Sequence, residues 1–181
     1  MNDLLTIIQG RRSIRTMESR PIAEEDLNKV LEAVRWAPSW VNTQSWEVVV
    51  ATDPKVKKAL QDSMSGMGNP AANAMVVAPV VLVMCARKGA SGFYKGEAAT
   101  KFGDWMMFDL GLATQNLLLM AHTIGLGTVV VGLFDHQKAA AAVAVPEGYE
   151  LVAMVPMGYP AKEAKPPKRR EVSEFTHNNR W

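Results

Sequence analysis

Pro-Val-Val-Leu-Val-Met-Cys-Ala, residues 79–86, is the stretch that most directly indicates how this chain folds. After its proline the run is uninterrupted and apolar, which is typical of a central strand that is buried on both faces. Trp46–Ala51 is a second Val-rich run and predicts another strand that is buried on both faces. Thr128–Val131 and Glu150–Met157 predict a third and a fourth strand.

Helical patterns separate these strands, and they do not alternate with them one for one. Helices are expected over residues 4–10, 24–37, 55–64, 104–124 and 137–145. The helix over 104–124 is apolar on nearly all faces, which places it in the core or in a subunit interface. Residues 65–74 predict a loop or a broken helix, and residues 87–103 a mobile excursion. The pattern therefore predicts an α+β fold in which helices flank a central mixed or antiparallel sheet.

Composition favours one domain that spans residues 1–181. The chain is 48% hydrophobic and 21% charged, which suits a single sizeable core. A net charge of +2 provides no general basic field for nucleic acid. Met1–Leu4 shows no signal-peptide pattern, no stretch is apolar enough to span a membrane, and Cys85 is the one cysteine. We therefore expect a cytoplasmic protein without membrane or nucleic-acid partners.

Two short segments near the N-terminus predict a bound mononucleotide. Arg-Arg-Ser-Ile-Arg, residues 11–15, concentrates the charge and the bidentate donors that a phosphate dianion requires. Taken alone, it could equally be a solvated basic turn. Ala37–Trp46 combines a proline-fixed turn with the side-chain amides of Asn42 and Gln44, which can read the edge of a flat, polar heterocycle.

Other candidate motifs are better explained by structure than by chemistry. Gly125-Leu126-Gly127 ends a helix and opens a strand, so it predicts a helix C-cap and not a dinucleotide fingerprint. Cys85 is expected to be a small buried hydrophobe. The three histidines lack metal-ligand spacing. Asp109 and Gln115 are expected to form hydrogen bonds at an interface.

Five segments of the chain together resemble the nitroreductase family, in the family's order and spacing, from about residue 4 to residue 170. They are residues 11–15, 37–46, 108–117, 125–128 and 157–160. The resemblance implies an α+β nitroreductase-like fold and an intertwined homodimer that exchanges its C-terminal segments. It also implies two FMN sites at the dimer interface, each lined by both chains.

The resemblance also assigns cofactor-binding residues by their matching positions. The N-terminal flavin motif is matched by Arg11, Arg12, Ser13 and Arg15, and the segment that the partner subunit brings over the ring by Pro38, Ser39 and Asn42. The backbone facing the isoalloxazine is matched by Val131 and Gly132, and the C-terminal residue that reaches the phosphate by Arg169 or Arg170. Trp40 is bulky where the family usually has a small residue, so the space beside the ring is expected to be narrowed.

The implied function is an FMN-dependent oxidoreductase with a ping-pong mechanism. Hydride from NADH or NADPH reaches flavin N5, and a nitroaromatic, a quinone or a similar small acceptor then takes the electrons. Flavin N5 carries the chemistry, so no catalytic side chain and no metal is expected. A cation at Arg15 would stabilise the reduced flavin anion. Two alternatives remain open, namely reductive dehalogenation or flavin fragmentation on the same scaffold, and an FMN-binding module without turnover.

Overall fold

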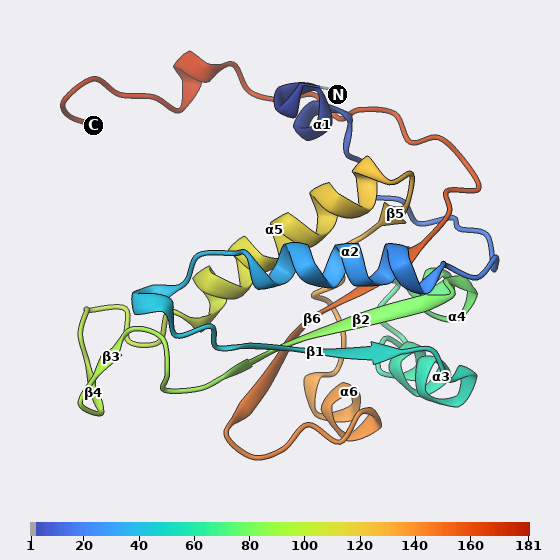
Figure 1. The fold of residues 1–181 in the computed structure, drawn as a ribbon, viewed down its shortest axis with the longest axis horizontal. Helices are drawn as coiled ribbons and strands as arrows, with labels where there is room; N and C mark the ends of the chain where they lie inside the picture. Colours follow the sequence, from blue (N-terminus) through green and yellow to red (C-terminus); the bar gives the residue numbers. More distant parts are fainter. Residues whose placement is uncertain (1–2) are drawn as a thin grey trace.

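The structure, a computed structural model, describes residues 3–181 and is organised around a four-stranded antiparallel sheet (Figure 1). Its strands are β1 (Trp46–Ala51), β2 (Val80–Arg87), β6 (Tyr149–Gly158) and β5 (Gly127–Thr128), in the order β1-β2-β6-β5. All three pairings are antiparallel. The expected central sheet is confirmed, and it is antiparallel.

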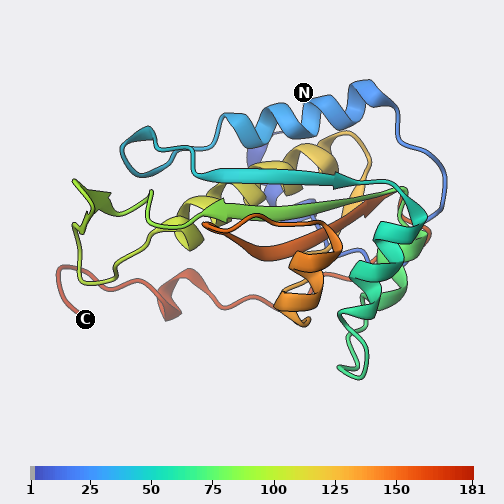
Figure 2. The same ribbon diagram turned by 90° about the horizontal axis from the view of Figure 1, so that it is seen from below.

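Helices cover both faces of this sheet. One face carries α2 (Glu24–Arg35) and α5 (Met106–Thr123), and the other carries α3 (Pro54–Asp62), α4 (Ala72–Val77) and α6 (His136–Ala142) (Figures 1 and 2). The short α1 (Leu4–Gly10) contacts α5 on the side away from the sheet. The expected α+β arrangement of helices around a sheet is therefore confirmed.

The position of strand β2 in the sheet explains why its sequence is apolar without interruption. Val81, Val83 and Cys85 belong to the core cluster beneath α3, α4 and α6. Leu82 and Met84 belong to the cluster beneath α2 and α5. Because successive side chains of a strand point to opposite faces, a strand covered on both sides must be apolar at every position.

Two strands differ from the expectation. Trp46–Ala51 forms β1 as predicted, but it is an edge strand with several half-exposed or exposed residues, so the expectation of burial on both faces is wrong. The third strand is shorter than Thr128–Val131, because the chain leaves the sheet after Thr128 and turns Val130 outward. Val131 returns to β6 as an isolated bridge to Met154.

The segments expected to be irregular contain more structure than predicted. Residues 87–103 include a small hairpin of β3 (Phe93–Tyr94) and β4 (Glu97–Ala98). The segment 65–74 is a series of turns that leads into α4, which the sequence pattern did not predict as a separate helix. Alanine, methionine and valine in α4 pack on the sheet, and Ala74 and Met75 are fully buried there.

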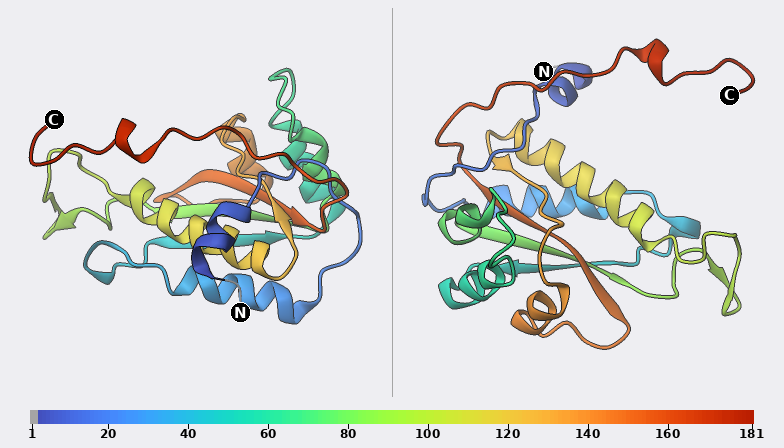
Figure 3. Two further views of the ribbon diagram at one scale, coloured as in Figure 1. Left: turned by 90° about the horizontal axis from the view of Figure 1, so that it is seen from above. Right: turned by 180° about the vertical axis from the view of Figure 1, so that it is seen from behind.

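The C-terminal segment runs past α1 and extends beyond it as an exposed tail (Figure 3). It contains one 3-10 turn, η2 (Val172–Glu174), and its apolar side chains Val172, Phe175 and Trp181 are exposed. Exchange of this tail between subunits stays a prediction. Met1 and Asn2, which entered the signal-peptide argument, lie outside the described residues. Within residues 3–181, no helix combines the length and the apolar character needed to cross a membrane.

Candidate functional site

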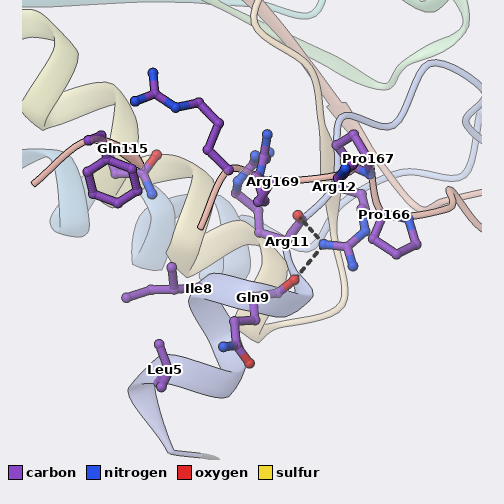
Figure 4. A pocket seen from close by; sticks show the side chains of 12 residues that line it. Leu5, Ile8, Gln9, Arg11, Arg12, Gln115, Pro166, Pro167 and Arg169 are labelled. Carbon is purple, nitrogen blue, oxygen red and sulfur yellow. Dashed lines mark hydrogen bonds between the residues drawn. The ribbon is translucent and has the colours of Figure 1, made fainter. Parts of the chain in front are cut away.

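The two arginine clusters of the sequence meet in space although they lie at opposite ends of the chain. Helix α1 ends where Arg11 turns to an extended conformation. The chain is then fixed by a hydrogen bond from the Ile14 amide to the Thr128 carbonyl, 2.9 Å long. Arg11 and Arg12 thereby line a cavity of about 870 Å³, and the tail passes over its other side (Figure 4). The tail contributes Pro166, Pro167, Lys168, Arg169 and Arg170 to the lining.

The electrostatics of this cavity favour an anionic ligand. Burial lowers the pKa of Arg11 below its usual value, and the neighbouring guanidinium groups of Arg169 and Arg12 lower it further. No Asp or Glu stands among the described residues that line the cavity. Like charges held together without a counter-ion repel one another, so an anion placed between them would relieve the repulsion.

The guanidinium groups of this cluster have different partners. Arg12 Nη1 donates to the carbonyl oxygens of Gln9 and Arg11, at 2.5 and 2.9 Å, and so binds the C-terminal end of α1 (Figure 4). Arg170 donates to the Glu174 carbonyl within the tail. Within residues 3–181, the structure shows no such side-chain hydrogen bond for Arg11 or Arg169, which leaves these two guanidinium groups available to a ligand.

The remaining residues of the N-terminal motif lie outside this lining. Ser13 is half-buried and forms a bridge with Thr128 at the end of β5. Arg15 is exposed and does not line the cavity. The structure thus brings Arg11 and Arg12 to the anion cavity and leaves Ser13 and Arg15 beside it.

Val131 and Gly132 form a fixed piece of backbone on another part of the sheet. The Val131 amide donates to the Met154 carbonyl at 2.8 Å, and the Met154 amide donates back to the Val131 carbonyl at 3.0 Å. The Val131 side chain is buried, whereas Gly132 is exposed. Neither residue lines the arginine cavity.

A second, smaller pocket of about 280 Å³ holds the residues of the proline-containing segment. It is lined by Pro38, Ser39, Trp40, Trp105, Phe108, Asp109 and Leu112. Asn42 is exposed in a left-handed conformation with φ of 56° and lies outside this lining. Within one chain, therefore, the proline-containing segment and the arginine cavity are separate sites along α5.

Several residues at these two sites were missed, or assigned a different role, by sequence reasoning. Asp109 was expected at an interface, but it is buried and accepts hydrogen bonds within the chain from the Trp40 amide and the Ser91 hydroxyl. The sequence signal for this role of Asp109 was a single carboxylate in the first turn of an apolar helix. Gln115 lines the arginine cavity and is exposed. Arg11 and His122 also line a further pocket of about 420 Å³, and burial, followed by the charges of Arg11 and Arg12, lowers the pKa of His122.

Comparison with known proteins places this fold and these segments in a family. The Nitroreductase family model matches residues 8–159. An NADH dehydrogenase of Thermus thermophilus is 31% identical, over 92% of this chain and 91% of its own length. An NAD(P)H-dependent FMN reductase of Bacillus subtilis is 28% identical, over 93% of this chain and 70% of its own length. Nitroreductase A of Vibrio parahaemolyticus superposes with a TM-score of 0.81 and 26% identity, over 100% of this chain and 78% of its own.

Other relatives carry different reactions in their names. A 5,6-dimethylbenzimidazole synthase of Rhodospirillum rubrum is 28% identical over 87% of this chain and 82% of its own length. Iodotyrosine deiodinase 1 of the rat is 25% identical over 93% of this chain and 67% of its own length. The family match covers most of the chain, and the relatives include nicotinamide-dependent oxidoreductases. The chain therefore belongs to the nitroreductase family, and the expected class of enzyme, an NAD(P)H-dependent oxidoreductase, is confirmed.

Proposed function

We propose that this protein is a cytoplasmic, single-domain, homodimeric FMN enzyme that takes hydride from NADH or NADPH and reduces a nitroaromatic, a quinone or a similar acceptor. The observation that carries the proposal is the anion cavity, where Arg11 and Arg169 meet from opposite ends of the chain without a carboxylate among the described lining residues. The named activities of the nitroreductase and FMN reductase relatives agree with it.

The residues of the cavity fit the phosphate of FMN. A phosphate dianion accepts bidentate hydrogen bonds, and the guanidinium groups of Arg11 and Arg169 have their donors free of intramolecular bonds in the described chain. Arg169 is preferred to Arg170, because Arg169 acts electrostatically on Arg11 whereas Arg170 is bound to Glu174. Arg12 supports the cluster by closing the end of α1.

Bound FMN would supply the redox chemistry by accepting hydride at N5 and passing two electrons to the acceptor in a ping-pong cycle. The chain has to hold this group and shape its surroundings. The hydrogen-bonded backbone at Val131 and Gly132 would face the ring, and the segment Pro38, Ser39, Trp40 and Asn42 of a second copy would cover it. Arg15 and Ser13 would complete the N-terminal motif. If one subunit binds the phosphate and the other covers the ring, the two pockets need not adjoin within one chain.

A visible spectrum of the purified protein tests the proposal directly. The two flavin bands should be present, or should appear after FMN is added and excess is removed, and anaerobic NADH or NADPH should bleach them. Addition of a nitroaromatic or a quinone should then restore the oxidised spectrum. A protein that neither contains nor takes up flavin would overturn the proposal.

A second function on the same scaffold is favoured by the deiodinase and dimethylbenzimidazole synthase relatives. Both names describe reactions other than nitroreduction. Product analysis separates them. Release of iodide from an iodinated phenol would favour dehalogenation, and loss of the added flavin under oxygen would favour flavin fragmentation. A flavin-loaded protein that neither nicotinamide bleaches would instead be a binding module.

A further inference from the structure

Asp109 is a buried carboxylate at the beginning of α5, and it has no cationic partner among the described residues. Only 2% of the residue is exposed. Its two oxygens lie 3.2 and 3.0 Å from the Trp40 amide nitrogen, and Oδ2 lies 2.6 Å from the Ser91 hydroxyl oxygen. A buried carboxylate is costly unless hydrogen bonds replace its water, so these contacts are what allows the group to be there. Its place in the first turn of a helix also suits a negative charge.

The contacts of Asp109 join two segments that are distant in sequence. The Trp40 turn is a strained piece of chain, since Val41, Asn42 and Gln44 all have left-handed φ values between 44° and 56°. Non-glycine residues keep such conformations only where surrounding contacts hold them. The turn is also fixed by the Ser39 hydroxyl, which accepts from the Gln44 amide at 2.9 Å. Two backbone bonds close it, from the Asn42 amide to the Ser39 carbonyl at 3.1 Å and from the Thr43 amide to the Trp40 carbonyl at 2.9 Å.

The second segment contains Ser91, which is fully buried and holds the chain on both of its sides. Its carbonyl accepts from the Trp105 amide at 3.0 Å, while its hydroxyl donates to Asp109. Gly92 packs so closely that a Cβ there would lie 2.6 Å from Trp105 Cδ1. Trp105 is held further by a 2.7 Å bond from its indole nitrogen to the Thr100 hydroxyl. Asp109 therefore fixes the chain that carries Trp105 as well as the turn that carries Trp40.

Trp40 and Trp105, which are fixed in this way, line the 280 Å³ pocket together with Phe108 of α5. The rings of Trp40 and Trp105 are 5.3 Å apart at 42°, and those of Trp105 and Phe108 are 5.3 Å apart at 69°. Phe108 is 58% exposed, so one side of the cluster is open to a ligand. Tilted rings around a small apolar pocket suit a flat aromatic molecule, which can stack on one ring and meet the edge of another.

We infer that Asp109 is a positioning residue, which holds the Trp40 and Ser91 segments so that Trp40, Trp105 and Phe108 form a site for the flat aromatic ring of an electron acceptor. The inference rests on the proposed function and adds a residue that positions the site for its acceptor. Asp109 also lines the pocket, but its two oxygens already accept hydrogen bonds from the Trp40 amide and the Ser91 hydroxyl. It acts through the Trp40 turn, which in the proposed dimer lies beside the flavin of the other subunit.

Steady-state kinetics with two acceptors test this role in the flavin-loaded dimer. A nitrobenzene derivative needs the aromatic pocket, whereas ferricyanide accepts electrons without an aromatic ring. For Asp109→Ala we expect the KM for the nitrobenzene derivative to rise about tenfold, which corresponds to the loss of one well-formed interaction. The kcat per bound flavin and the KM with ferricyanide should stay within about twofold of the parent. Rates are given per bound flavin because the Trp40 turn also covers the flavin in the proposed dimer.

Two milder variants keep the test decisive if Asp109→Ala does not fold. Ser91→Ala removes one hydrogen bond and leaves the carboxylate on the Trp40 amide. Asp109→Asn keeps the shape, with an oxygen for the Trp40 amide and an NH₂ for the Ser91 hydroxyl. We expect Asp109→Asn to keep most of the parent's preference for the aromatic acceptor and Ser91→Ala to lose part of it. Thr114→Val is the matched control, because Thr114 is also buried on α5 but its hydroxyl, within residues 3–181, donates to the Leu110 carbonyl of its own helix.

The outcomes separate this inference from the proposed function. If the variants load flavin and are bleached by NAD(P)H, but the KM values for both acceptors change equally or not at all, Asp109 has no positioning role. The same conclusion follows if Thr114→Val shifts the preference as much as Asp109→Ala. If the parent protein itself binds no flavin, the proposed function fails first and is recognised by its spectrum.

Discussion

Replacing Arg11 with alanine should separate the binding of the phosphate from the stability of the fold. Arg11 is half-buried beside Arg169 and Arg12. Burial is the largest cause of its lowered pKa, and the charges of these two neighbours lower the pKa further. In the free protein this side chain is a repelled charge, so its removal should leave the melting temperature unchanged or slightly raised. With FMN bound, the same side chain would donate charge-assisted hydrogen bonds to phosphate.

The loss of FMN affinity can be estimated from the hydrogen bonds that Arg11 would donate to the phosphate. A hydrogen bond to a charged group contributes about 1.5–3 kcal/mol, and each 1.4 kcal/mol changes a dissociation constant tenfold. Arg11→Ala should therefore weaken FMN roughly 10- to 100-fold. Riboflavin has the same ring and no phosphate, so its affinity should change less than about twofold. The ratio of the two dissociation constants isolates the phosphate contribution.

Fluorescence titration of the flavin-free protein with FMN and with riboflavin gives both constants, and thermal melts give the stability. Arg35→Ala is the control, since Arg35 is an exposed arginine on α2 that pairs with Glu32 and lies away from the cavity. This variant removes the same formal charge and should leave both affinities as they are. The reasoning is refuted if Arg11→Ala retains its full flavin through dialysis, or if FMN and riboflavin are weakened equally.

Three further predictions concern residues around the core and the cavity. Burial raises the pKa of the Cys85 thiol from 9.0 to about 11, so the thiol ionises at lower pH in the unfolded chain than in the folded one. The free energy of unfolding should therefore fall by up to about 2–3 kcal/mol between pH 9 and 11. Denaturant melts of Cys85→Ala should not show this loss. The charges of Arg11 and Arg12 help to lower the pKa of His122, so saturation with inorganic phosphate or FMN should raise that pKa. If an NMR titration shows the same His122 pKa with and without the anion, the anion binds elsewhere. Gly127→Ala should destabilise the fold by about 1–3 kcal/mol, because the new Cβ would lie 2.8 Å from Ile14 Cβ. An unchanged denaturation midpoint would contradict that close approach.

Local patterns were sufficient to predict most of the helices and strands. The run at residues 79–86 is apolar because β2 is covered on both faces, so its burial can be seen in its composition. The order of strands cannot be seen in the same way. Trp46–Ala51 is nearly as apolar as β2, yet it has a neighbour on one side only, and that depends on which segments pair across the sheet.

The candidate site was predicted in part for a similar reason. The charge cluster at residues 11–15 is visible in the sequence, but its meeting with Arg169 was expected only through the family resemblance, because no spacing rule relates the two ends of a chain. The role of Asp109 depends on Trp40 and Ser91, which approach it from two loops. Contacts of that kind are set by tertiary packing, and a sequence pattern indicates only that a carboxylate in an apolar helix needs partners.

The separation of the two pockets within one chain leads to a quantitative test of a shared site. Suppose one variant carries Arg11→Ala, and a second carries Trp40→Ala with Asn42→Ala. If each flavin site takes its phosphate residues from one subunit and its covering segment from the other, a mixed dimer contains one fully altered site and one fully native site. Random exchange of equal amounts makes about half of the dimers mixed, so about a quarter of all sites should recover native FMN affinity and turnover. Each variant alone has no native site. If both halves of the site came from one chain, mixing would restore nothing, and the proposed interface site would be wrong even though each pocket is correctly placed.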